Sequence, residues 1–256
     1  KLPTRLKAWR EASYQTPKAE SFNVSKDGDK SIVKVTYRFP QVDAQWEITY
    51  KVFANGIIKV DNRFVAEGTE TPMIPRVGLR MQLSEILNDL TYYGRGPEEN
   101  YRDRRTSQFI GEYTTPIKDL YEPYIRPQEN EHRTDIYWCA LTTKQKAGLL
   151  FIADRTFELN ASNYLLGSLD SGETIDNGAP RTNETNHRHL TDPQPVKQVD
   201  MFIDYRMMGV GGDNSWGAIA HEPYLIRPGV ENAIEYGFSI VPFDKKADYK
   251  NLIYQY

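Results

Sequence analysis

The sequence predicts an all-β sandwich or barrel, and three observations lead to this fold class. Apolar and polar residues alternate with a period of two in most segments of the 256-residue chain. Turn-forming residues separate these segments at regular intervals, which gives about ten expected strands in all. Aromatic residues, which strands favour, are abundant at 17 Tyr, 10 Phe and 4 Trp. Aromatic rings also serve carbohydrate sites, but packing in strands accounts for most of them.

The first half of the chain carries four alternating segments that predict half-buried strands. Between the second and the third lies Asn55-Gly56, a dipeptide that favours a two-residue hairpin turn. A helix is expected only at 4–13, where Leu6 and Trp9 stand at helical spacing, and in a short stretch near Ser107. The four expected strands cover residues 31–39, 46–52, 58–64 and 77–83.

The second half repeats the strand pattern. Residues 135–142 and 147–153 form an expected strand pair with a polar loop between them, and further strands are expected at 156–161, 198–205 and 233–241. Two segments, 93–127 and 170–195, are long and irregular. Loops of this length in a compact domain are usually functional or interfacial.

Composition excludes several classes of protein. The chain has 32 basic and 35 acidic residues, a net charge of −3 that argues against nucleic acid or an anionic membrane as partner. Its apolar runs are too short for a transmembrane helix. Cys139 is the single cysteine, so neither an intrachain disulfide nor a cysteine-based zinc site can form. The compartment stays open, because any targeting signal would lie outside this sequence.

Several carboxylates are candidates for the acid pair that hydrolysis of a glycosidic bond requires. Acidic and basic residues are about equally numerous around them, which favours salt bridges over catalysis. Arginines beside a carboxylate lower its pKa, which is unfavourable for a general acid. Glu129 and Glu131 are expected on one side of a strand. The acids are Glu98, Glu99, Asp103, Glu129 and Glu131, and the arginines are Arg102, Arg104, Arg105, Arg126 and Arg133.

Histidines offer a weaker signal. His187 and His189 would share one face of a strand, but Glu184 and Asp192 are only candidates for a third ligand, so no metal site is predicted. A sugar mutarotase needs a histidine acid and a carboxylate base. His132 and His221 could also serve, and the sequence does not choose among the four.

A glycine-rich segment at 208–216 is the best local candidate for a binding site. It does not continue as a phosphate loop, since no Lys-Ser or Lys-Thr pair follows. Asp213 and Asn214 can accept hydrogen bonds from turn amides. Trp216 then stands at the tip of a loop, where it either meets a partner or plugs the end of the sandwich.

Four motifs resemble the C-terminal domain of family-two glycoside hydrolases of the β-galactosidase type. Residues 93–104 match G-x-G-P-x-E-N-Y-x-D-R, and 123–133 match P-Y-x-x-P-x-E-N-G-x-R with Glu131 in place of the glycine and His132 intervening. Residues 185–190 match T-x-H-R-H-L and 208–216 match M-G-x-G-G-D-x-S-W. The motifs occur in the order of the family, and weaker similarity runs from Trp9 to Phe243.

The resemblance implies a supersandwich of the galactose-mutarotase-like type over residues 1–243, followed by an extension at 244–256. It also implies that the catalytic glutamates lie on a TIM barrel earlier in the parent chain, and that magnesium and sodium bind mainly on the barrel side. This chain would then hold no catalytic residue, metal or cofactor, and Trp216 would form an apolar platform for a β-galactoside or another carbohydrate. Its protein partner would be the barrel domain of the same parent chain.

One departure concerns the opening of the domain. The family's domain usually begins with an aromatic-Arg-x-Pro-x-Asp-Asn-Asp stretch, which is not found before Lys1. We therefore expect the first strands of the sandwich to be missing, edges to be exposed, and the isolated chain to be inactive and prone to form homo-oligomers. Two alternatives are a free-standing aldose mutarotase or epimerase, and a carbohydrate-binding or structural module.

Overall fold

The structure is a computed structural model that describes residues 6–15, 17–67, 73–169, 189–214, 216–229 and 233–255. Its strands are β1 (Ala19–Asp27), β2 (Lys30–Phe39), β3 (Ala44–Val52), β4 (Ile58–Ala66), β5 (Arg76–Ser84), β6 (Asp89–Gly96), β7 (Phe109–Pro116), β8 (Arg133–Thr142), β9 (Gly148–Ser162), β10 (Gln198–Met207) and β11 (Ile234–Phe243). The helices are α2 (Lys7–Tyr14) and α3 (Tyr249–Leu252), with short 3₁₀ turns at Pro40–Val42, Ile117–Asp119, Leu166–Leu169 and Glu222–Tyr224. The predicted all-β class is confirmed.

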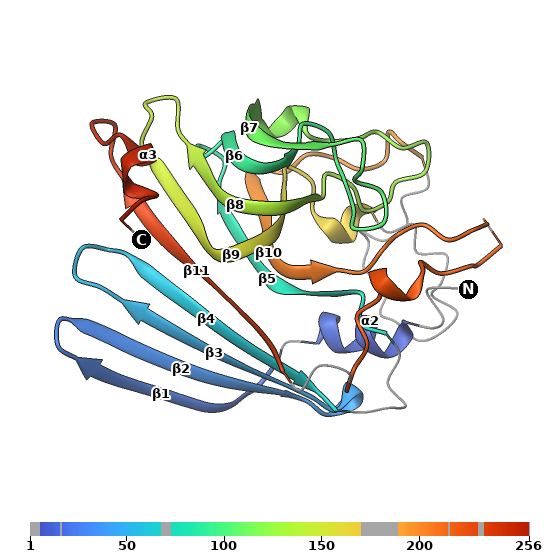
Figure 1. The fold of residues 1–256 in the computed structure, drawn as a ribbon, viewed down its shortest axis with the longest axis horizontal. Coiled ribbons are helices and arrows are strands. Elements are labelled where there is room, and N and C mark those ends of the chain that lie inside the picture. The colour runs from blue at the N-terminus through green and yellow to red at the C-terminus, as the bar shows by residue number, and fades with distance from the viewer. Residues whose placement is uncertain are drawn as a thin grey trace.

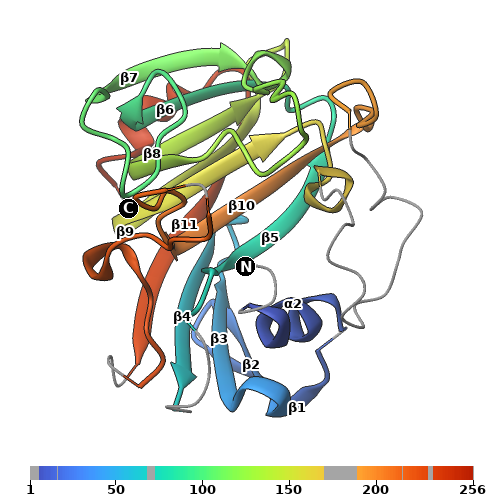
Figure 2. The ribbon, with the colours of Figure 1, turned by 90° about the vertical axis from the view of Figure 1, so that its right-hand side faces the viewer.

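All eleven strands belong to one antiparallel sheet that branches at β9. The main path runs β1-β2-β3-β4-β11-β9-β8-β6-β7, and β10 joins β9 to β5. Figure 1 shows β1–β4 and β11 in one part of the sheet and β5–β10 in the other, and Figure 2 shows the same arrangement from the side. Residues 148–153 of β9 pair with β11, whereas 158–162 pair with β10. The 15-residue strand β9 therefore holds the two parts of the sheet together.

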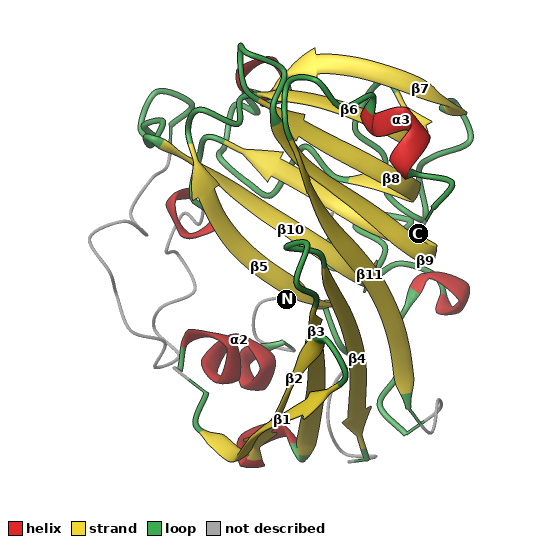
Figure 3. Cartoon of the chain, turned by 90° about the vertical axis from the view of Figure 1, so that its left-hand side faces the viewer, coloured by secondary structure: helices red, strands yellow, loops and turns green. Residues whose placement is uncertain are grey.

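The largest core lies between these two parts. Its buried residues come from β3, β4, β6 and β8–β11, so side chains distant in sequence pack against one another. Phe151, Phe157 and Phe238 are among its largest buried side chains, and Cys139 is buried with them. A second core forms where α2 covers the ends of β3 and β4 (Figure 3), with Trp9 against Phe64 at 6.3 Å between ring centroids. No helix of the described residues is long and apolar enough to span a membrane.

The predicted strands are confirmed within two residues at most ends, and the helix expected at 4–13 is α2. Three strands were not predicted: β1, β6 and β7. The strands expected at 147–153 and 156–161 are one continuous strand, β9. The strand expected through Glu129 and Glu131 is wrong, since residues 123–132 form irregular loop. The helix expected near Ser107 is also absent. An isolated turn forms there instead, in which the Gln108 amide donates to the Arg105 carbonyl.

Two hairpins share one turn geometry. Between β3 and β4 the Phe53 amide donates to the Ile57 carbonyl at 2.9 Å, so the loop is longer than the two residues predicted at Asn55-Gly56. Gly56 takes φ +85°, a conformation that glycine adopts without strain. Between β8 and β9 the Thr143 amide donates to the Ala147 carbonyl at 2.8 Å, and Lys146 holds the left-handed position at φ +65°. A lysine there carries backbone strain that a glycine would not.

The C-terminal segment packs on the sheet. Tyr249, Leu252 and Ile253 lie against a small core that includes Trp138 and Phe243, and the Tyr249 and Phe243 rings are 5.0 Å apart. Asp248 caps α3 by accepting the Lys250 amide hydrogen at 3.1 Å. The described part of residues 244–255 therefore covers apolar surface at one end of the sheet, and the boundary drawn at 243 stays a prediction.

Candidate functional site

The glycine-rich segment forms a closely packed loop after β10. Gly209 lies against Asp103 and Ala220, and a side chain at Gly212 would collide with the Ala218 backbone. Both positions therefore exclude a Cβ atom, which explains why glycines stand there. Trp216 follows on the outward side of the loop, with 92% of its surface exposed. Trp216 thus does not plug the sandwich within the described part of the chain.

Hydrogen bonds brace this loop at its base. The Asp103 carboxylate accepts the amide hydrogens of Val210 at 3.1 Å and Gly211 at 2.7 Å. The Asn214 side chain accepts the Trp216 amide hydrogen at 2.9 Å. Carboxylate bonds to backbone amides are stronger than neutral ones. Asp103 therefore braces the loop that carries Trp216 through backbone amides, rather than through the salt bridge expected for it from the sequence.

An exposed histidine and aspartate pair lies on the same loop. His221 Nε2 is 2.8 Å from Asp213 Oδ1, and both side chains are solvent-exposed. The contact closes the loop across eight residues of sequence. Exposed ion pairs add little to stability, but this pair places an imidazole and a carboxylate within reach of solvent close to Trp216 in sequence.

The residues next to Asp103 connect this loop to a buried polar network. Tyr101 Oη donates to Glu129 Oε2 at 2.6 Å, and Arg102 lies 3.3 Å from Glu158. Burial, with the charges of Glu129 and Glu99, raises the pKa of Tyr101, so its hydroxyl keeps its proton and acts as a donor. Three consecutive residues thus anchor the exposed loop to the interior of the sheet.

His132 is at the centre of the network. Its Nε2 is 2.9 Å from Glu158 Oε2 and its Nδ1 is 2.7 Å from Asn160 Oδ1, and the side chain is completely buried. Burial lowers the pKa of His132, but the hydrogen bond and the charge of Glu158, with the charge of Glu129, outweigh burial and raise it. The Met207 amide also donates to Glu158 at 2.7 Å, next to the glycine-rich segment.

Two buried acids in this region have raised pKa values. Burial raises the pKa of Glu131 to about 8, although the Ser162 hydroxyl donates to it at 3.0 Å and Arg133 lies nearby. Glu131 also holds φ +67°. Burial likewise raises the pKa of Asp204 to about 6, although the charge of Arg76, whose Nε atom lies 2.8 Å from the carboxylate, acts in the opposite direction. The expectation that neighbouring arginines hold the pKa values of these loop acids low is wrong for Glu131.

The other acids singled out in the sequence serve structural contacts. Glu99 bonds to Arg104 and to the Tyr124 hydroxyl, and it accepts the Glu131 amide hydrogen at 2.8 Å. Glu129 lies 3.5 Å from Arg76. The salt bridge predicted for Glu99 is formed with Arg104, whereas Glu129 pairs with Arg76, which is not one of the arginines considered in the sequence. The Glu98 side chain is exposed, and the backbone amide of Glu98 donates a hydrogen bond to the Gln108 side chain.

The described residues contain no group of three or more His, Cys, Asp and Glu side chains that could hold a metal ion. His187 and Glu184 lie outside the described residues. His189 is described, and its amide donates to Asp192 at 2.9 Å in a turn. The metal pair considered at His187 and His189 therefore stays untested.

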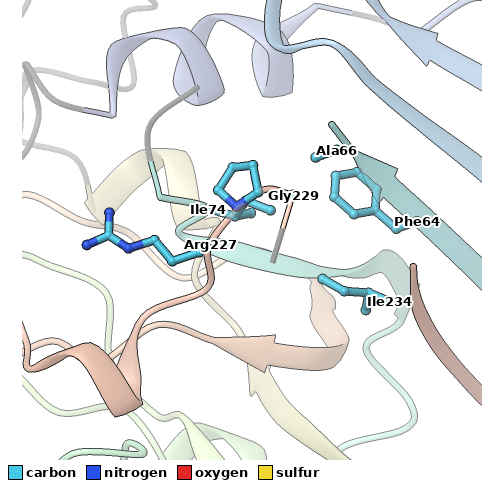
Figure 4. Close-up of a pocket in the computed structure, with 7 residues that line it drawn as sticks. Phe64, Ala66, Ile74, Arg227, Gly229 and Ile234 are labelled. Atoms are coloured by element: carbon cyan, nitrogen blue, oxygen red, sulfur yellow. The ribbon is translucent and has the colours of Figure 1, made fainter. Parts of the chain in front are cut away.

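A small cavity, whose lining includes no residue of the 208–216 segment, is shown in Figure 4. Phe64, Ala66, Ile74 and Ile234 form its apolar wall, and residues 227–229 close it. Its volume of about 10 Å³ is close to that of one water molecule and far below that of a sugar ring. A wider hollow of about 380 Å³ also includes no residue of the 208–216 segment, and its lining consists of Ala12, Gln15, residues 17–20 and residues 38–41.

The sheet and the loop together define the class: an all-β domain that presents an exposed tryptophan from a braced glycine-rich loop. The chain belongs to the β-galactosidase small chain family, whose profile matches residues 3–240. It is 30% identical over 226 residues to a β-galactosidase of Priestia megaterium, covering 88% of this chain and 20% of that protein. It is 31% identical over 224 residues to a β-galactosidase of Lactobacillus delbrueckii subsp. bulgaricus, covering 86% of this chain and 20% of that protein. The chain thus spans about a fifth of the length of these relatives.

Among solved structures, a GH36 α-galactosidase from Geobacillus stearothermophilus is similar with a TM-score of 0.43 at 10% identity, over 90% of this chain and 28% of that chain. A GalM/aldose epimerase homologue from C. elegans is similar with a TM-score of 0.42 at 11% identity, over 87% of this chain and 68% of that chain. Both TM-scores are under 0.5, and the all-β class rests on the eleven-stranded sheet of the described residues.

Proposed function

We propose that this chain is the C-terminal domain of a β-galactosidase, an enzyme that hydrolyses terminal β-D-galactose residues, and that Trp216 is its platform for sugar. The exposure of Trp216 carries the proposal, because a large aromatic side chain 92% exposed on a braced loop has apolar surface available for a ligand. Relatives that carry the name β-galactosidase and match this chain over a fifth of their length support the parent enzyme.

The catalytic carboxylates, in this proposal, belong to another domain of the parent. Glycoside hydrolysis needs two acids that face a substrate across a few ångströms. Here the carboxylates of Glu131 and Glu158 are buried in the sheet and are not accessible to a substrate. Glu99 and Glu129 are engaged by Arg104 and Arg76. These contacts support a structural role for the network: it holds the Asp103 loop, which in turn holds the loop of Trp216.

Kinetics of the parent enzyme test the platform. Trp216→Ala should raise KM about fivefold with a smaller change in kcat, because stacking on an aromatic ring contributes about 1 kcal/mol. Trp216→Phe should restore most of the affinity, since it keeps an apolar face. Phe109→Ala is the matched control, because Phe109 is also an exposed aromatic side chain but lies on β7. A Trp216→Ala enzyme with unchanged kinetics would contradict the platform.

A second candidate function, aldose mutarotation, is favoured by the exposed pair of His221 and Asp213. A histidine acid and a carboxylate base can exchange protons with an anomeric hydroxyl. The test is polarimetry of freshly dissolved α-D-galactose with the isolated chain and with its His221→Gln variant. Acceleration that His221→Gln abolishes would replace the first proposal. No acceleration would leave the acid and base outside this chain.

A further inference from the structure

The segment 207–211, which leads into the loop of Trp216, is held through its backbone amides. Every amide hydrogen of this segment is donated, two of them to backbone carbonyls and three to carboxylates. Glu158 accepts the Met207 amide hydrogen, and Asp103 accepts the next two. Charged acceptors form the stronger hydrogen bonds, so the two carboxylates largely determine where the segment lies. The carbonyls belong to Pro75 and Tyr224.

One four-residue turn joins the two carboxylates. The ends of the turn, Tyr101 and Arg104, exchange backbone hydrogen bonds at 3.3 and 2.8 Å. Its central residues are Arg102 and Asp103, and the Arg102 Nη1 atom lies 3.3 Å from Glu158 Oε1. The turn, the two carboxylates and the amides of 207–211 therefore form one closed ring of contacts. In this ring Arg102 is the residue that ties Glu158 to Asp103.

The contact between Arg102 and Glu158 is shielded from solvent. The Glu158 side chain is 4% exposed and that of Arg102 is 23% exposed. Glu158 Oε2 is shared by the Met207 amide at 2.7 Å and His132 Nε2 at 2.9 Å, whereas Oε1 contacts Arg102. A buried carboxylate oxygen that loses its partner is unfavourable. Without the guanidinium, the Glu158 side chain therefore has to move or draw in water, and its hold on Met207 weakens.

We propose that Arg102 is a positioning residue for Trp216, which it acts on by fixing Glu158 and with it the start of the tryptophan loop. The inference rests on the proposed function, in which Trp216 is the platform for sugar. Stacking on an aromatic ring depends on the distance and orientation of that ring. A displaced loop therefore weakens sugar binding, while the catalytic carboxylates of the parent enzyme stay in place. The effect belongs in KM rather than in kcat.

A double-mutant cycle in the parent enzyme tests this role. Arg102→Met keeps much of the side-chain volume but removes the charge, and it should raise KM about two- to threefold. Arg102→Lys should restore part of the loss, since its ammonium group keeps the charge but not the geometry of the guanidinium. On top of Trp216→Ala, Arg102→Met should raise KM no further, because both changes act on one contact with sugar. Independent sites would multiply their effects to about tenfold or more over the parent.

Hydrogen exchange of the same parent enzymes reports on the loop without any sugar. Arg102→Met should speed exchange of the amides in 207–211 about tenfold, measured by mass spectrometry on peptides that span this segment. The two amides bonded to backbone carbonyls should respond least, because their acceptors are outside the ring.

Arg80→Met is the matched control. Arg80 also pairs with a buried carboxylate of the sheet, since its Nε atom lies 2.7 Å from Asp200 Oδ1. Asp200 in turn accepts the Leu166 amide hydrogen and not one from the tryptophan loop. Arg80→Met should therefore lower stability but leave KM and the exchange of 207–211 unchanged.

The outcomes separate this inference from the proposed function. A rise in KM from Arg102→Met that persists in full on top of Trp216→Ala would overturn the positioning role and leave the platform intact. Unchanged KM and unchanged exchange in Arg102→Met would overturn it as well. If Trp216→Ala itself leaves KM unchanged, the platform fails instead, and the exchange measurement alone then supports or overturns Arg102 as the residue that holds the loop.

Discussion

Replacing Glu131 by glutamine should make the stability of the protein less dependent on pH. The side chain is buried, and burial raises its pKa from 4.5 to about 8. In the unfolded chain the carboxyl ionises near 4.5, so between these values the folded state keeps a proton that the unfolded state releases. The free energy of unfolding therefore falls as pH rises from 4.5 to 8, by about 1.4 kcal/mol per pH unit. At pH 7 the loss amounts to about 3 kcal/mol.

The Glu131→Gln variant has no proton to lose, so its stability relative to the parent should grow with pH. The assay is urea denaturation at pH 5, 6, 7 and 8, with the difference in free energy of unfolding plotted against pH. We expect a slope of about 1.4 kcal/mol per pH unit in favour of glutamine. Glu98→Gln, at an exposed position, should give a flat line. Asp204 titrates in both proteins and cancels in the difference. A flat line for Glu131→Gln would refute the reasoning.

Three further outcomes are expected. Lys146→Gly should raise the free energy of unfolding in urea by about 0.5–1 kcal/mol, because it relieves the left-handed backbone at φ +65°; a loss of stability would contradict the strain. Phe151→Ala should lower it by about 3–5 kcal/mol, since the ring is fully buried, and a loss below 1 kcal/mol would show a looser core. Asp103→Ala should speed hydrogen exchange at Val210 and Gly211 about tenfold or more, measured by mass spectrometry on peptides spanning 208–214, with exchange in β8 unchanged. Unaltered exchange would separate Asp103 from the loop.

The period-two pattern predicted eight of the eleven strands. It did not predict β1, β6 and β7, because the pattern is weak or interrupted in these strands. In β3 and β4 the alternation arises because one face meets the core, whereas β8 and the second half of β9 are buried on both faces. β1 exposes every residue, and only Phe22 and Val24 alternate with polar residues in it, so its pattern is too short to indicate a strand. β6 contains Gly94 and Gly96, which resemble turn residues but are required because Ile136 and Tyr92 leave no room for a side chain. A strand with glycines of this kind cannot be distinguished from a loop by sequence pattern alone.

The candidate site shows the same division. The glycines and the exposed Trp216 follow from a contiguous segment, so the sequence located them. The buried network joins Tyr101, His132 and Glu158 from three separate parts of the chain, and no local spacing marks them. The raised pKa of Glu131 was also not predictable, because neighbouring arginines in sequence suggested the opposite direction. Burial, which the sequence does not report for a single side chain, decides that direction.

The length of β9 has a consequence for how the protein unfolds. Its first half is hydrogen-bonded to β11 and its second half to β10, while β8 pairs along both. Neither part of the sheet can detach without releasing a strand on which the other depends. The two parts should therefore melt together in one calorimetric transition, with equal van 't Hoff and calorimetric enthalpies. Amides at the centre of β9 should exchange only through that global opening, and those of β1 should exchange first.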